Sequence, residues 1–207
     1  MSDPKIGFIG YGEAADYICQ GLMGEGVTGI TAFDVWAREA PDGINMAESL
    51  GALMEAADVV FAAVTSAVAL GVANEAAPHL TDRHIYVDIN SVSPETKIRI
   101  GEVISATGAR FVEAAVMAGV PGYGHKVPML LAGGAAPDLI ALMAPLGMVM
   151  EDFGPQLGRA AAAKMFRSVM VKGMEALFQE CVLGAGRYGV AERVLESIGD
   201  GYPGIDW

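Results

Sequence analysis

Positive charge is scarce in this chain of 207 residues: 13 lysines and arginines stand against 25 aspartates and glutamates, a formal net charge of -12. Such a chain repels the phosphates of nucleic acids and the headgroups of anionic membranes. Charged residues make up only 18% of the sequence, whereas hydrophobic residues make up 53%. That balance allows enough apolar burial to offset the conformational entropy lost on folding. We therefore expect a compact protein that binds neither nucleic acid nor membrane.

Long apolar runs, cysteine pairs and an export signal are also lacking. The longest uncharged apolar run, residues 59–73, is shorter than the roughly 20 residues that a bilayer span needs. Acidic residues interrupt the first 17 residues, so no signal-peptide core is expected there. Cys19 and Cys181 form no CxxC pair, and the three histidines have no metal-ligand spacing. These absences predict a cytoplasmic protein with reduced, buried thiols, surface or loop histidines and no metal site.

Short apolar segments alternate with helical stretches over the first 150 or so residues. The apolar segments are β-branched or aromatic and lack strict alternation, as in strands that are covered on both faces. Strands are expected at residues 5–10, 29–34, 58–64, 85–89, 110–116, 127–133 and 148–153. Helices are expected at residues 13–23, 46–54, 66–77 and 94–107. This order predicts an α/β fold with a doubly wound parallel sheet.

The pattern changes near Gly154, where one long helical stretch, residues 156–184, begins without an internal proline. Apolar residues cover most of its circumference, so something must bury it. The residues that follow are too few for a second core of their own. We expect a first domain at residues 1–154 and a partial helical domain at residues 155–207, completed by further chain or by a second copy in a homodimer.

A glycine-rich turn follows the first predicted strand and opens the first predicted helix, with the sequence Gly10-Tyr11-Gly12-Glu13-Ala14-Ala15. In a GxGxxA pattern the first glycine allows the tight turn, the second lets a pyrophosphate approach the backbone, and the small last residue lets the helix pack on the strand. The helix N-terminus offers amides and a positive dipole end to the anion. The pattern predicts dinucleotide binding at these six residues, although the glycines could also serve only a tight turn.

Asp34 stands at the end of the second predicted strand, where a carboxylate binds the adenine ribose hydroxyls of a dinucleotide. A carboxylate there repels a ribose 2'-phosphate, which favours NAD over NADP. Arg38 could pair with that phosphate, so NADP stays open. Asp34 could alternatively cap only the next helix.

Four segments together carry a resemblance to a known family: IGFIGYGEAA, DINSVSP (88–94), VEAAVMAGVP (112–121) and GRAAAAKMFRS (158–168). The chain resembles the β-hydroxyacid dehydrogenase superfamily, in particular 6-phosphogluconate-dehydrogenase-like oxidoreductases with a distinct C-terminal domain. The resemblance implies a Rossmann domain, a long linking helix and a helical domain that commonly dimerises. The chain is expected to stop inside that helical domain.

The resemblance also implies roles for single residues. Val64 and Thr65 would lie along the cofactor, and Asn90 and Ser91 beside the nicotinamide and the substrate. Lys164 matches the catalytic lysine of the family. Ser168 stands where the family usually has asparagine, and Met117-Ala118-Gly119 replaces a Ser-Gly-Gly substrate loop. These two departures put the usual small 3-hydroxy-acid substrate in doubt.

Helical spacing places Lys164 in a polar stripe on an otherwise apolar helix, with Ser168, Lys172, Glu175 and Gln179. A lysine in a largely apolar pocket has its pKa lowered by desolvation, which suits it to acid and base catalysis. The same stripe could instead be an ordinary solvated helix face.

The leading functional hypothesis is an NAD(P)-dependent dehydrogenase or reductase acting on a small hydroxy acid, alcohol or carbonyl compound. Lys164, Ser168 and Ser91 are its expected catalytic residues. Reduction of an imine is a second enzymatic reading. A dinucleotide-binding module that senses redox state without turnover is a third.

Overall fold

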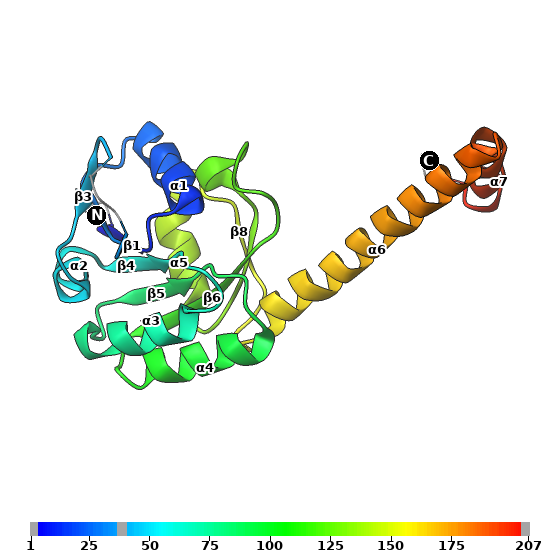
Figure 1. Cartoon of the computed structure of the whole chain (residues 1–207). Helices are drawn as coiled ribbons and strands as arrows, with labels where there is room; N and C mark the ends of the chain where they lie inside the picture. Colours follow the sequence, from blue (N-terminus) through cyan, green and yellow to red (C-terminus); the bar gives the residue numbers. More distant parts are fainter. Residues whose placement is uncertain (1–3, 37–40, 204–207) are drawn as a thin grey trace. The chain divides into compact units, whose positions relative to one another are not determined.

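The computed structural model describes residues 4–36 and 41–203 (Figure 1). Contacts between Cα atoms divide the chain into two compact units, Met1–Lys164 and Met165–Trp207. No helix of the described residues is both long enough and apolar enough to cross a membrane.

The first unit is built on one eight-stranded sheet in the order β3-β2-β1-β4-β5-β6-β7-β8. Its strands are β1 (Ile6–Ile9), β2 (Ile30–Phe33), β3 (Ile44–Met46), β4 (Val59–Ala62), β5 (Ile85–Asp88), β6 (Arg110–Val116), β7 (Met129–Ala132) and β8 (Met150–Asp152). Neighbouring strands are parallel except for β6 and β7. The chain winds outward from β1 to β3 and then from β4 to β6, so the doubly wound α/β fold is confirmed.

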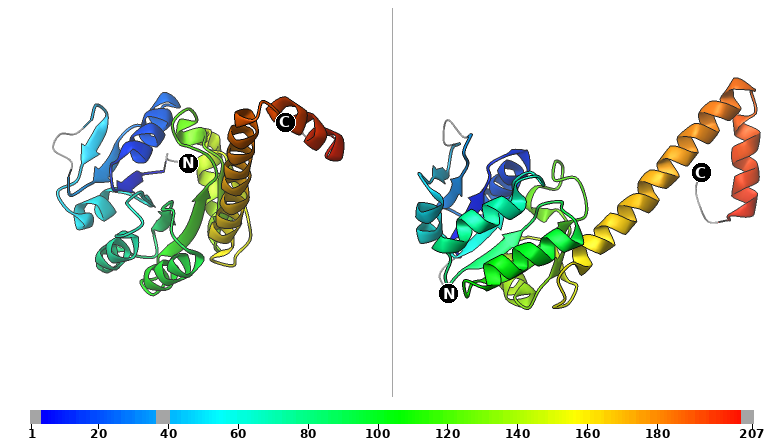
Figure 2. Two further views of the ribbon diagram at one scale, coloured as in Figure 1. Left: turned by 45° about the vertical axis from the view of Figure 1, so that its right-hand side comes forward. Right: turned by 60° about the horizontal axis from the view of Figure 1, so that its bottom comes forward.

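Helices cover both faces of this sheet (Figure 2). They are α1 (Glu13–Gly24), α2 (Leu50–Ala56), α3 (Ala69–Ala76), α4 (Pro94–Ser105) and α5 (Ala136–Met143), with short 3-10 helices η1 (Ala77–His79), η2 (Gly124–Lys126) and η3 (Ala144–Leu146). One buried core joins α1 and α5 to the sheet, around the stacked rings of Phe8 and Phe61. A second core joins α2, α3 and α4 to the other face, around Val60 and Tyr86. Strands β1, β4 and β5 are buried along their whole length, which explains their continuous apolar sequence.

Three features of the first unit differ from the sequence prediction. Strand β7 is antiparallel to β6, because residues 117–128 join them through η2 without a crossover α-helix. Strand β3 is a three-residue strand at the sheet edge whose last residue falls where a helix was expected. Helix α5 was not predicted, because its start in Ala136-Pro137 follows Gly-Gly-Ala and reads as a loop.

The long helix α6 (Arg159–Arg187) begins in the first unit and continues into the second. The compact first unit ends at Lys164, ten residues after the boundary expected from the sequence, because Ala160 and Ala161 in the first turn of α6 are buried against it. The second unit also contains α7 (Ala191–Gly201), which was not predicted as a helix.

Apolar side chains are exposed along the second unit. They are Met165, Phe166, Val169, Met170, Met174, Leu177, Phe178, Leu183, Tyr188, Val190 and Tyr202. Among them Leu183 is 70% and Leu177 68% exposed, so this surface is large and apolar in the isolated chain.

Candidate functional site

The turn between β1 and α1 requires glycine at its first position. Gly10 has a φ of +86°, and a Cβ atom built there would lie 2.5 Å from the carbonyl oxygen of Ala63 on the neighbouring strand connection. The Gly10 amide donates a 2.8 Å hydrogen bond to the carbonyl of Phe33. Gly10 therefore holds the turn between the ends of β2 and β4.

Gly12 is the N-cap of α1, and a Cβ atom built there would meet no atom within 4 Å. No described side chain caps this helix end, so side chains leave its first amides available to a ligand. Ala15 is fully buried where α1 packs on the sheet. Glu13 is exposed, whereas Ala14 faces a pocket beside the turn. This open cradle at a helix N-terminus fits the diphosphate of a dinucleotide.

Asp34 ties the glycine-rich turn to the end of β2. One carboxylate oxygen accepts a 2.7 Å hydrogen bond from the amide of Tyr11, and the other accepts a 2.7 Å bond from the amide of Trp36. The phenol of Tyr11 donates to Asp16 within α1. Trp36 is 86% exposed beside this carboxylate, and sequence reasoning did not single it out. Arg38 lies outside the described residues.

A pocket with a cavity volume of about 340 Å³ lies at the carboxyl ends of β4, β5 and β6, next to α1. The edge formed by the carboxyl ends of parallel strands is where ligands bind in open α/β sheets. Its lining residues are Ala14, Ala63, Val64, Ser66, Ile89, Asn90, Ser91, Val116, Ala118, Val120 and Lys164.

The pocket brings together Ala14, Val64, Asn90, Ser91 and Lys164, all five predicted as site residues. Thr65 is not among its lining residues, and Ser66 takes its place.

Ser168 belongs to the second unit, one helical turn beyond Lys164. Ala118 lines the pocket from the segment that replaces the Ser-Gly-Gly loop, and it offers only a methyl group.

Lys164 and Ser91 are direct partners in this pocket. The Lys164 ammonium donates a 2.7 Å hydrogen bond to the Ser91 hydroxyl, across 73 positions of sequence. Partial burial lowers the pKa of Lys164, and the positive charge of Lys97 lowers it further. A lysine with a lowered pKa exchanges a proton more readily near neutral pH than an exposed lysine does.

Asn90 fixes the floor of the pocket. Its side-chain oxygen accepts a 2.7 Å hydrogen bond from the Val64 amide, and its side-chain amide donates to Asp88. Asn90 therefore joins the ends of β4 and β5, and its side chain is 5% exposed.

Two histidines and one cysteine differ from expectation. His84 and His125 are buried rather than at the surface. His125 packs against Gly21 of α1 and is not a lining residue of the pocket. Cys19 is buried and desolvation raises the pKa of its thiol to about 12, as suits an inert thiol, but Cys181 is only partly buried.

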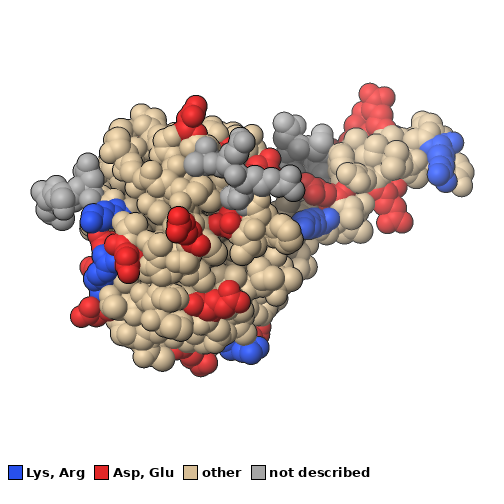
Figure 3. Space-filling view, turned by 60° about the vertical axis from the view of Figure 1, so that its left-hand side comes forward, with Lys and Arg blue, Asp and Glu red and all other residues tan. Residues whose placement is uncertain are grey.

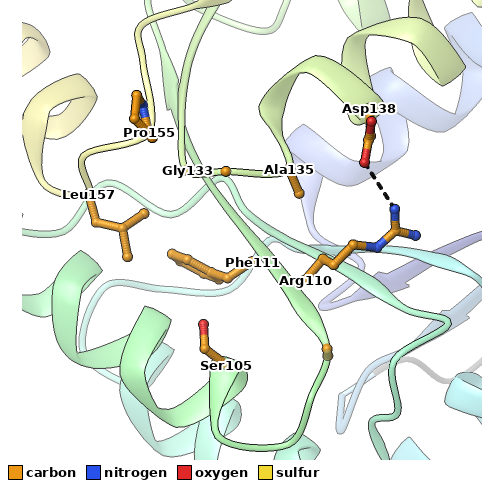
Figure 4. Close-up of a pocket in the computed structure, with 10 residues that line it drawn as sticks. Ser105, Arg110, Phe111, Gly133, Ala135, Asp138, Pro155 and Leu157 are labelled. Atoms are coloured by element: carbon orange, nitrogen blue, oxygen red, sulfur yellow. Dashed lines mark hydrogen bonds and ion pairs between the residues drawn. The ribbon is translucent and has the colours of Figure 1, made fainter.

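A second pocket of similar volume lies at the amino end of β6 (Figure 4). Phe111, Leu157 and Pro155 form its apolar wall, and its two charged side chains, Arg110 and Asp138, pair with each other at 3.2 Å. It has no unpaired charge, and it lies at the amino end of β6, away from the carboxyl ends of β4, β5 and β6. Among the described residues no three His, Cys, Asp or Glu side chains form a metal-binding group.

Comparison with known families decides the relationship. Residues 5–151 match the NAD binding domain of 6-phosphogluconate dehydrogenase. The chain belongs to this family. The predicted β-hydroxyacid dehydrogenase superfamily is thereby confirmed, and the first unit is an NAD(P)-binding domain of a hydroxyacid-dehydrogenase-like oxidoreductase.

Two relatives and one structure of the same fold are similar to this 6-phosphogluconate dehydrogenase-like chain. A conserved hypothetical protein from Sinorhizobium meliloti 1021 is 40% identical, with a TM-score of 0.85 over 98% of this chain and 71% of its own. The 2-(hydroxymethyl)glutarate dehydrogenase of Eubacterium barkeri is 25% identical over 94% of this chain and 67% of its own length. An imine reductase from Aspergillus terreus, in complex with NADPH4, shares the fold at 17% identity, with a TM-score of 0.79 over 97% of this chain and 72% of its own.

The surface agrees with the acidic composition. On the face drawn in Figure 3, acidic side chains are spread over the surface, and the described basic side chains do not gather into a broad patch.

Proposed function

We propose that this protein transfers a hydride between a nicotinamide dinucleotide and a small hydroxy acid, alcohol or carbonyl compound, with Lys164 as general acid and base. The observation that carries this proposal is the hydrogen bond between Lys164 and Ser91 in a pocket that adjoins the glycine-rich turn. A proton-transferring group and a dinucleotide cradle at one edge of the sheet suit this reaction class.

When bound, the nicotinamide supplies the hydride acceptor or donor. The Gly12 turn and the first amides of α1 would hold the diphosphate, and Asp34 would bind the adenine ribose. Val64 and Asn90 would lie along the cofactor towards the pocket. The backbone amide of Val64 already donates a hydrogen bond to the side chain of Asn90, so this floor of the pocket needs little reorganisation when the cofactor binds.

Lys164 would exchange the proton of the reacting oxygen. Its neutral amine takes the hydroxyl proton during alcohol oxidation, and its ammonium returns a proton during carbonyl reduction. Ser91 holds the amine in the pocket through the 2.7 Å hydrogen bond. A lowered pKa raises the fraction of neutral amine at a given pH, which favours the proton exchange that both directions need.

Binding and turnover are measured separately to test this function. NADH and NADPH are titrated by fluorescence, and alcohols, 3-hydroxyisobutyrate, 2-(hydroxymethyl)glutarate, small ketones and aldehydes are then screened by absorbance at 340 nm. Binding together with turnover of any member of this panel supports the proposal. Absence of binding by both dinucleotides would overturn it.

Imine reduction is a second candidate, because the pocket wall is apolar at Val116, Ala118 and Val120 and no serine stands in the replaced loop. An apolar wall suits a hydrophobic cyclic imine better than a carboxylate. Turnover of a cyclic imine but of no alcohol or carbonyl compound would favour this candidate. Binding of dinucleotide without turnover of any compound would favour a redox-sensing module.

Exchanging Asp34 for serine is expected to shift the preference from NADH towards NADPH by on the order of tenfold, because a carboxylate that would repel the 2'-phosphate is lost. The ratio of the two dissociation constants checks this. Asp82→Ser, which removes an exposed carboxylate elsewhere, serves as the control. An unchanged ratio would remove Asp34 from the ribose site.

We also propose that the second unit mediates a homodimer, because its exposed apolar side chains form a surface that a second copy would bury. Light scattering should give about twice the chain mass of 21.5 kDa. Leu177→Glu should return the protein to a monomer, whereas Val149→Glu at an exposed position of the first unit should not. A monomer in the unmodified protein would contradict this proposal.

A further inference from the structure

Three charged side chains are completely buried beneath the pocket. Asp88 and Glu113 are each 0% exposed, and Lys97 is 1% exposed. Asp88 and Glu113 are register neighbours on β5 and β6, and Lys97 reaches Asp88 from α4. Burying three charges is costly, so their arrangement calls for a role beyond packing.

Lys97 holds the end of β5. Its ammonium donates hydrogen bonds to the carbonyl oxygens of Asp88 at 2.6 Å and Ala114 at 3.2 Å, and it lies 3.2 Å from the Asp88 carboxylate. That carboxylate accepts hydrogen bonds from the backbone amide of Asn90, at 3.0 Å, and from its side chain. Lys97 thereby fixes the segment that leads from β5 to Ser91.

Glu113 holds the beginning of α6. Its two carboxylate oxygens accept hydrogen bonds from the amides of Gly158, at 2.5 Å, and Ala161, at 2.6 Å. A carboxylate at a helix N-terminus satisfies free amides and the positive end of the helix dipole. Lys164 follows in the next turn, so the position of its backbone depends on this cap.

We propose that Lys97 and Glu113 are positioning residues of the site: beneath the pocket Lys97 fixes the end of β5 and Glu113 fixes the first turn of α6, so that Ser91 and Lys164 meet at hydrogen-bonding distance. This inference rests on the proposed role of Lys164 as acid and base. It adds to the site two buried charged residues that do not line the pocket.

The charge of Lys97 also acts on Lys164. The charged groups that face Lys97 are Asp88 from β5, Glu113 from β6 and Lys164 from α6. Since the positive charge of Lys97 lowers the pKa of Lys164, its removal should raise that pKa. Loss of the Glu113 cap should act in the same direction, because a loosened first turn exposes the amine to water.

A titration of Lys164 that needs neither cofactor nor substrate tests this inference. The amine is labelled with trace acetic anhydride across a range of pH, and mass spectrometry of the peptides gives the pH at which each lysine becomes reactive. Exposed Lys5 serves as the internal reference. Circular dichroism at each pH confirms that the protein is folded.

Lys97→Met and Glu113→Gln should move the Lys164 midpoint to higher pH, by on the order of one unit for Lys97→Met. Lys97→Arg keeps the positive charge. The Lys164 midpoint of this variant should therefore stay near that of the original protein, even if its thermal stability is lower. Arg99→Met and Glu102→Gln remove exposed charges from the same α4 and should change nothing. If Lys97→Met does not fold, Lys97→Gln replaces it.

Folded Lys97 and Glu113 variants that titrate like the original protein would overturn the positioning role. That result is separate from the catalytic role, because the labelling involves no turnover. A protein whose Lys164 midpoint shifts as expected, but which turns over nothing, would instead retain the positioning role and lose the proposed reaction.

Discussion

Replacing Lys164 with alanine is expected to lower kcat by about 10²-fold or more and to leave the affinity for NADH or NADPH nearly unchanged. Loss of a general acid and base typically costs 10²- to 10⁴-fold, whereas the diphosphate cradle lies at the separate Gly12 turn. Steady-state rates with the best compound of the screen, together with dinucleotide fluorescence, measure the two effects.

The pH dependence should follow the direction of the Lys164 shift. In the oxidation direction the neutral amine is the active form, so kcat/KM should rise with pH and level off above a midpoint below the ordinary pKa of lysine. In the reduction direction the ammonium is active and the rate should fall through the same midpoint. Lys5→Ala, which removes an exposed lysine of the same unit, is the control for Lys164→Ala. A collapse of dinucleotide affinity in Lys164→Ala would reassign the lysine to binding.

Replacing Gly12 with aspartate should weaken dinucleotide binding by on the order of 10²-fold or more. The new carboxylate would stand against the diphosphate, and two like charges about 4 Å apart repel strongly near a protein surface. The variant should fold, because a Cβ atom at Gly12 meets nothing within 4 Å. Fluorescence titration measures the loss, and thermal unfolding verifies the fold.

Gly24→Asp is the matched control for this variant. Gly24 is at the other end of the same helix, and a Cβ atom there also meets nothing within 4 Å. It adds the same charge far from the cradle and should leave binding intact. Equal binding by Gly12→Asp and Gly24→Asp would show that the turn does not hold the diphosphate.

The buried Lys97 shows why some features escaped prediction. A lysine between threonine and isoleucine on an amphipathic helix reads as a surface residue. Its burial depends on Asp88 and Glu113, which come from two other segments of the chain. The one local signal was the glutamate in VEAAV, a charge inside an otherwise apolar strand. Buried charges are rare unless they are paired, so that glutamate could have prompted a search for its partners.

The position of Ser66 was missed for a different reason. Thr65 and Ser66 are adjacent polar residues after β4, and only the path of the chain beyond the strand decides which of them lines the pocket. The orientation of β7 also escaped prediction, since the sequence of a strand shows its hydrophobic pattern but not whether it runs parallel or antiparallel to its neighbour.

The sequence by itself determined the parallel strands β1, β2, β4 and β5 with the helices between them, the glycine-rich turn and the acid at the end of β2, because apolar periodicity and glycine's backbone freedom act over a few neighbouring residues. Only the tertiary structure decided that Ser91 meets Lys164, that Asn90 joins two strands and that Glu113 caps α6. Those contacts link segments up to 73 positions apart, and they form only when packing of the sheet and helices brings the segments together.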